Sequence, residues 1–262
     1  MSVFEAIVLA IVEGLTEFLP VSSTGHMIIA SSAMGIASNP FVKTFTVAIQ
    51  LGAILSVFVL YWRRFFQTVN FYFKLALGAL PAAVLGLLLN DYIDQLLERV
   101  EVVALMLILG GIVFLFLDKL FGDSEGQAAP SYSAALKIGF FQCLAMVPGV
   151  SRSAASIIGG LSQRLTKQAA AEFSFFLAIP TMFGATALKL LKYYKAGHGI
   201  SSQELSLLAI GNLVAFVIAL LSIRWLMMVI PKYGFKIFGY YRIALGIIIL
   251  LLFYSGVGLS IF

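Results

Sequence analysis

The residue types best suited to chemistry lie in one apolar segment near the start of the chain, EGLTEFLPVSSTGH at positions 13–26. Glu13 and Glu17 are four residues apart, so a helix would place both carboxylates on one face. Like charges at this spacing repel each other, and burial adds a further cost. A shared divalent cation, or a proton retained on one carboxyl group, would offset that cost. The alternative without chemistry is a glutamate pair at a helix end that reaches the surface.

Three hydroxyl residues, a glycine and a histidine follow in the same segment: Ser22, Ser23, Thr24, Gly25 and His26. Serine and threonine cap the first turn of a helix, and glycine lets the backbone approach a ligand closely. A cap alone needs one or two hydroxyl groups, whereas this run also suits the binding of phosphate oxygens. His26 is either a hydrogen-bonded core histidine or a general acid or base near neutral pH. The two nearby carboxylates favour the chemical role.

A second polar cluster, PGVSRSAAS at 148–156, places Arg152 between Ser151 and Ser153. An arginine just after Pro-Gly fits the first turn of a helix, where backbone N–H groups, the helix dipole and the guanidinium converge on one anion. Phosphate is the natural anion, because pairs of its oxygens match the guanidinium fork. The alternative is a salt bridge from Arg152 to Glu13 or Glu17, and the two roles are compatible.

Together the two clusters predict a site for phosphoryl chemistry. Two carboxylates with hydroxyl, water and phosphate oxygens are hard ligands, so we expect Glu13 and Glu17 to bind Mg²⁺ or Ca²⁺ rather than zinc. A metal, an anion clamp, a nucleophile and a proton donor are what phosphoryl transfer requires. From the residues alone, either a hydroxyl of Ser22, Ser23 or Thr24 attacks phosphorus, or a metal-bound water does.

The composition indicates an integral membrane protein. Of 262 residues, 61% are hydrophobic and 11% are charged, and the mean hydropathy is +1.03; soluble domains carry about 25% charged residues. The net charge of +5 comes without a basic stripe, so we expect no nucleic-acid partner. A site among lipid-facing helices implies a substrate with a lipid tail. Cys143 is the single cysteine, which excludes an intrachain disulfide, and we expect no removable signal peptide.

Hydropathy predicts an all-α fold with six transmembrane helices and two re-entrant helix hairpins. Two apolar regions, 3–33 and 138–163, are broken by proline and polar residues, as in hairpins that enter and leave a membrane on one side. The six uncharged stretches predicted to span the membrane are 44–62, 75–90, 102–117, 173–188, 205–223 and 243–262.

The hairpins also indicate an internal repeat within a single membrane domain, 1–262. Pro20 and Pro148 are 128 residues apart, and so are Phe45 and Phe173, which begin similar apolar motifs. Each half, about 1–125 and about 130–262, then holds one hairpin and three spans. Because three is odd, the second half is inverted relative to the first, and such repeats place a site near the midplane.

The distribution of basic residues predicts the orientation. Eleven lysines and arginines, Arg242 among them, fall in loops on one side, and five fall on the side where the first hairpin opens. The positive-inside rule makes the richer side cytoplasmic, so the site opens outward. The acidic loop 91–101 then lies outside as a solvated surface.

The motifs EGLTEFLPVSSTGH and PGVSRSAAS together resemble the undecaprenyl-diphosphate phosphatase family of the bacitracin-resistance type. The likeness extends to AIQLGAI at 48–54, to EFSFFLAIP at 172–180 and to the overall length. It implies a phosphoric anhydride hydrolase that converts undecaprenyl diphosphate to undecaprenyl phosphate and phosphate, which recycles the cell-wall lipid carrier and confers bacitracin resistance. It also implies a bacterial plasma membrane, an outward-opening site and dependence on Mg²⁺ or Ca²⁺.

By position, the resemblance implies that Glu13 and Glu17 are the acidic pair, Ser23 the nucleophile, His26 its catalytic partner and Arg152 the diphosphate clamp. The second motif reads GVSRSAAS where some relatives have GFSRSGAT, so it keeps the arginine and its two neighbouring serines and differs at position 154.

Two other classes remain open at this stage. A polyprenyl-phosphate flippase or transporter would share the inverted-repeat architecture and use the acidic pair for coupling. An ion channel is disfavoured, because no ring of carbonyls or repeated charges is visible. Membrane lipids are expected partners, and the oligomeric state, including a homo-oligomer, is open.

Overall fold

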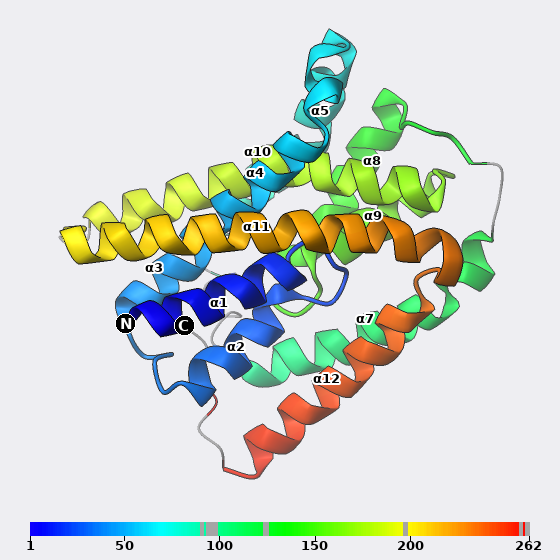
Figure 1. Ribbon diagram of the computed structural model, residues 1–262. Coiled ribbons are helices and arrows are strands. Elements are labelled where there is room, and N and C mark those ends of the chain that lie inside the picture. The colour runs from blue at the N-terminus through cyan, green and yellow to red at the C-terminus, as the bar shows by residue number, and fades with distance from the viewer. Residues whose placement is uncertain (90–91, 93–98, 123–125, 196–198, 257–258, 260–262) are drawn as a thin grey trace.

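Helices build the described part of the protein (Figure 1). A computed structural model describes residues 1–262 except 90–91, 93–98, 123–125, 196–198, 257–258 and 260–262. Within these residues the only extended pairing is an isolated β-bridge between Gln127 and Leu165. The predicted all-α class is therefore confirmed.

Six helical segments are long and apolar enough to cross a membrane, which confirms the six predicted spans. The first consists of two consecutive helices, and the other five are single helices. The bounds are α3 Pro40–Ala48 with α4 Gln50–Leu60, α5 Val69–Leu88, α7 Val100–Phe121, α10 Lys167–Lys195, α11 Ser202–Tyr233 and α12 Lys236–Tyr254. All six begin before the predicted stretches, because charged or polar residues occupy their first turns. Helices α7, α10 and α11 also end beyond the predicted limits, whereas α4, α5 and α12 end earlier, at Leu60, Leu88 and Tyr254.

Two pairs of shorter helices form at the interrupted regions. The first pair is α1, Val3–Thr16, and α2, Ser23–Ala33. The second pair is α8, Tyr132–Cys143, and α9, Arg152–Ser162. At about 1.5 Å per residue, none of the four reaches the roughly 30 Å of a hydrocarbon core. One-turn 3₁₀ helices occur at Trp62–Phe66, before α5, and at Leu144–Met146, after α8.

The two short pairs pack against the long helices in matching ways. Helix α1 lies along α11, α8 lies along α5, and the last spans of the two halves, α7 and α12, lie along each other (Figure 1). Small residues permit these close approaches: Gly14 faces Ala215 and Ala219, and Gly139 faces the backbone of Gly78. Such small-residue contacts are typical of helix packing in membranes.

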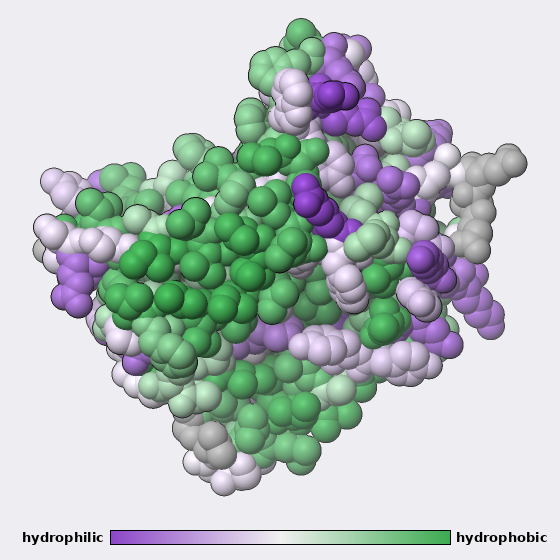
Figure 2. All heavy atoms as spheres, in the orientation of Figure 1, coloured by the Kyte–Doolittle hydropathy of each residue, from purple (hydrophilic) through white to green (hydrophobic). Residues whose placement is uncertain are grey.

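Large apolar side chains are exposed over much of the surface. Figure 2 shows a broad hydrophobic face over α10 and α11, with hydrophilic residues toward the two ends of the molecule. Exposed residues of this kind on α11 include Leu213, Val217 and Leu221. A surface of this extent needs lipid contact, which fits an integral membrane protein.

One basic residue counted toward the orientation does not reach a membrane surface. Arg242 was counted on the richer side, but its side chain is fully buried inside α12. It is stable there because four backbone carbonyl groups accept its N–H groups. Ten basic residues then remain against five, so the sign of the bias is unchanged. Most of the acidic loop 91–101 lies outside the described residues.

Candidate active site

In each short helix pair, the turn between the two helices contains a serine with a positive φ angle. Ser22, just before α2, has φ 67° and ψ 99°, and Ser151, just before α9, has φ 72° and ψ 120°. Positive φ is costly for a residue with a β-carbon, and such strain is often found at functional sites. The matching geometry places Ser23 and Arg152 at the first position of their helices. The sequence offered no sign of this strain, because glycine is the usual residue there.

Glu17 joins the two turns. The hydroxyl group of Ser23 donates to Oε2 of Glu17 at 2.8 Å, and Nη2 of Arg152 donates to Oε1 at 3.0 Å. Glu17 is buried, with 8% of its surface exposed. Of the two expected salt bridges to Arg152, the described structure contains the one to Glu17, and it brings three residues predicted for the site into one cluster.

Glu13 lies beside this cluster with unused hydrogen-bonding capacity. It is 1% exposed, and its Oε1 atom is buried without a partner among the described residues. The side chains of Glu17 and Gln50 interact with it. Adjacent carboxylates with an orphaned oxygen are the donor set that a hard divalent cation accepts, so Glu13 and Glu17 fit a metal ligated mainly by carboxylate, water and substrate oxygens. The described residues contain no group of three or more histidine, cysteine or acidic side chains placed to hold a metal ion.

Arg152 is held on several sides. Its Nη1 donates to the carbonyl of Ser174 at 2.8 Å, and its guanidinium lies 5.6 Å from the centre of the Phe18 ring. The hydroxyl oxygens of Ser156 and Ser174, which also lie beside Arg152, are 2.7 Å apart and hydrogen-bond to each other. The Nε atom of Arg152 and the hydroxyl of Ser153 are buried without partners among the described residues, so donors remain for an anion.

His26 is oriented by a residue from the other end of the chain. Its Nδ1 lies 2.8 Å from the carbonyl oxygen of Ser22, and its Nε2 lies 2.6 Å from the hydroxyl of Tyr241 on α12. The two rings stack, with centroids 5.6 Å apart and planes 7° apart. In the described structure the hydrogen bond of Ser23 therefore goes to Glu17, and both ring nitrogens of His26 have other partners.

The remaining predicted site residues do not take part in the hydrogen bonds around Glu17. The hydroxyl of Ser151 accepts from the amide of Ala154 at 3.3 Å, which caps α9. Ser22 is buried and Thr24 half-buried at the start of α2. Gly25 packs toward α7, where an added β-carbon would lie 2.9 Å from Leu107.

Three residues at the site were not predicted, namely Gln50, Tyr241 and Arg242. Gln50 lies in the AIQLGAI segment, which contributed to the family resemblance but was given no role in the site. Tyr241 and Arg242 lie more than 200 residues from the first motif, so only tertiary packing brings them to it.

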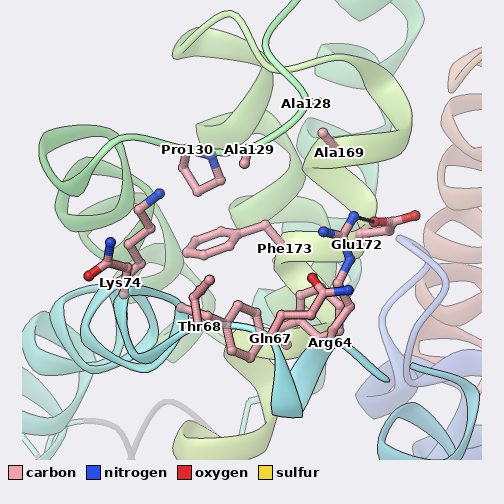
Figure 3. A pocket seen from close by; sticks show the side chains of 13 residues that line it. Arg64, Gln67, Thr68, Lys74, Ala128, Ala129, Pro130, Ala169, Glu172 and Phe173 are labelled. Carbon is pink, nitrogen blue, oxygen red and sulfur yellow. Dashed lines mark ion pairs between the residues drawn. The ribbon is translucent and has the colours of Figure 1, made fainter. Parts of the chain in front are cut away.

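A separate pocket lies away from this cluster (Figure 3). Its wall combines aromatic residues of α5 and α10 with Arg64, Lys74 and Glu172, and Arg64 pairs with Glu172 at 3.8 Å. It contains none of the residues predicted for chemistry.

The fold and the cluster define a multi-pass helical membrane protein with a serine, two glutamates and an arginine gathered at two broken helices. The chain belongs to the family described as bacitracin resistance protein BacA, whose model matches residues 6–248.

Several relatives carry the name undecaprenyl-diphosphatase. The chain is 59% identical to the one from Flavobacterium johnsoniae over 255 residues, which is 96% of both chains. It is 51% identical to that of Porphyromonas gingivalis over 100% of both chains, and 50% identical to that of Bdellovibrio bacteriovorus over 98% of both.

Proposed function

We propose that the protein hydrolyses undecaprenyl diphosphate to undecaprenyl phosphate and inorganic phosphate. The observation that supports this most directly is the bridge of Glu17 between Ser23 and Arg152, since it unites a hydroxyl nucleophile, a proton acceptor and a cation. The family and the names of the relatives point to the same reaction. Release of the lipid phosphate from the diphosphate recycles the cell-wall carrier and underlies bacitracin resistance at the family level.

The first chemical step follows from the hydrogen bonds. The hydroxyl oxygen of Ser23 attacks the terminal phosphorus, and its proton passes to Oε2 of Glu17, 2.8 Å away. The bond from that phosphorus to the bridging oxygen breaks, and undecaprenyl phosphate leaves. Water then hydrolyses the phosphoserine and restores the hydroxyl group. Direct attack by water, with Ser23 positioning the phosphate, is the competing route.

Arg152 balances charge before and during the reaction. In the free protein it neutralises Glu17. An incoming diphosphate competes with Glu17 for the Nη2 donor, and the unpartnered Nε adds a second donor. Transfer of Arg152 to the diphosphate frees Glu17 to accept the proton of Ser23. His26, one helical turn from Ser23, remains the candidate to protonate or deprotonate a phosphate oxygen.

A divalent cation, Mg²⁺ or Ca²⁺, is proposed to bind at Glu13 and Glu17. When bound, it neutralises phosphate charge and polarises the phosphorus. The buried carboxylate oxygen of Glu13 without a described partner supports this assignment.

The architecture around the site is proposed to be an inverted repeat with two re-entrant hairpins. The matching packing of α1 on α11 and α8 on α5, and the matching strained serines, support a pseudo-twofold relation. The two turns then meet near the membrane midplane. With the ten-to-five charge bias, the first hairpin and the site open to the outer face of the bacterial plasma membrane.

The decisive experiment measures phosphate release from undecaprenyl diphosphate by the purified protein in detergent. Release is expected with Mg²⁺ or Ca²⁺, loss of release with chelator, and recovery when either metal returns. Ser23→Ala, with folding checked by thermal unfolding, should lose turnover. Absence of release under every metal condition would contradict the hydrolase proposal and favour the polyprenyl-phosphate flippase.

A further inference from the structure

The most completely buried cation outside the proposed chemistry is Arg242 on α12. Its side chain has no exposed surface, and the described residues contain no carboxylate paired with it. Burial of a charge is expensive unless hydrogen bonds compensate it. The partners of Arg242 are backbone carbonyl groups, which points to a role in holding the backbone.

Those carbonyl groups belong to both site turns. Nη1 donates to Pro20 at 3.1 Å, and Nη2 lies 3.0 Å from the carbonyl oxygen of Gly149 and 3.1 Å from that of Val150. Nη2 also lies 3.2 Å from the carbonyl of Met106 on α7. One planar group therefore ties the first turn, the second turn and α7 together.

The held peptides lie immediately before the two strained serines. Pro20 precedes Ser22 by two residues, and Val150 directly precedes Ser151. Backbone strain of order 1–3 kcal/mol persists only where the surroundings fix it. The next residues, Ser23 and Arg152, are the two that meet at Glu17.

We propose that Arg242 is the positioning residue that sets Ser23 and Arg152 about Glu17 by pinning the two turns. The inference rests on the proposed hydrolase activity. Lysine cannot replace this function, because its donors sit on a single atom and cannot reach both turns as a planar fork does. If Arg242 were only a structural cation, Arg242→Lys would leave kcat unchanged or would lower it only by destabilising the protein.

Gly110 provides a way to move the guanidinium without removing it. A β-carbon at Gly110 on α7 would overlap Nη2 of Arg242, and its nearest neighbours are all atoms of that guanidinium group. Gly110→Ala therefore displaces the fork and keeps the charge. Gly246→Ala is the matched control, because the nearest neighbours of its β-carbon would be Ala104, Leu107 and Ile108 on α7 rather than Arg242.

The experiment compares kcat and KM for undecaprenyl diphosphate, with thermal unfolding, in wild type, Arg242→Lys, Gly110→Ala and Gly246→Ala. A displacement of order 1 Å costs about 10²-fold in rate. We expect kcat to fall by about that factor in Arg242→Lys and by about 10-fold in Gly110→Ala, and we expect the unfolding midpoint to fall in both, because each change disturbs the hydrogen bonds of a buried cation. Gly246→Ala should lower the midpoint more than kcat.

The outcomes separate the two proposals. An inactive wild type under all metal conditions would overturn the hydrolase assignment. With an active wild type, a near-normal kcat in Gly110→Ala would overturn the positioning role, even if Arg242→Lys failed to fold. A loss of kcat in Gly246→Ala equal to that in Gly110→Ala would also overturn it, since packing alone would then explain the effect.

Discussion

At the scale of single residues, Glu17 is the group on which the site depends. Its two oxygens have separate partners, Ser23 on one turn and Arg152 on the other. A carboxylate shared in this way holds the proposed nucleophile and a cation at fixed separation before substrate arrives. This preorganisation reduces the entropic cost of reaching the transition state.

Glu17→Gln keeps the size of the side chain and removes its capacity to accept a proton. We expect kcat to fall by about 10²–10⁴-fold, because the acceptor for the Ser23 proton and one carboxylate proposed to bind the divalent cation are both lost. Phosphate release under saturating substrate measures it. Glu5→Gln is the control on the same helix, since Glu5 belongs to the capping box of α1 and glutamine can still cap. A Glu17→Gln protein with more than half of the wild-type kcat would contradict the role.

Tyr241→Phe removes the hydroxyl group that meets His26 and retains the stacked ring. Loss of one hydrogen bond of about 1 kcal/mol should lower kcat/KM by about fivefold. The neighbouring Tyr240→Phe is the control, because the hydroxyl that meets His26 belongs to Tyr241 and not to Tyr240. If Tyr241 acts through His26, Tyr241→Phe should add nothing in a His26→Ala background. Additive losses in the double variant would contradict that link.

At the scale of elements, the sequence predicted the helices better than their contacts. Hydropathy located the six spans, and proline with polar residues located the two breaks, because both signals are local. The bridge to Arg152 was expected as one of two alternatives, since opposite charges in an apolar protein must meet. Tyr241 and Arg242 have no local signal of their role. Arg242 resembles any basic residue near a span end, and only the packing of α12 on α7 reveals its position.

Ser22 provides a test of strain in the first turn. Its side chain makes no capping hydrogen bond, so Ser22→Gly removes the penalty of positive φ without loss of a cap. Glycine also raises the conformational entropy of the unfolded chain, which offsets part of this gain. We expect a net increase of about 1 kcal/mol in the free energy of unfolding, measured as a higher thermal midpoint in detergent. Ser151→Gly should gain less, because Ser151 caps α9. A lower midpoint for Ser22→Gly would show that the conformation is not strained.

At the scale of the whole molecule, two chain halves contribute unlike parts to one site. The first half supplies the carboxylates, hydroxyl groups and histidine, and the second supplies Arg152, Tyr241 and Arg242. The ion pair at the centre of the cluster takes Glu17 from the first half and Arg152 from the second. The direction in which the site opens is therefore tied to the orientation of the whole protein.

That orientation is testable because Cys143 is the single cysteine. In a Cys143→Ser background, Gln203→Cys in the first turn of α11 and Gln67→Cys just before α5 place one exposed thiol at each end of the molecule. The positive-inside bias predicts that an impermeant maleimide added outside intact spheroplasts labels position 203 and not position 67. Both should label after permeabilisation, which serves as the control. The reverse pattern would place the opening of the first hairpin, and with it the site, on the cytoplasmic face.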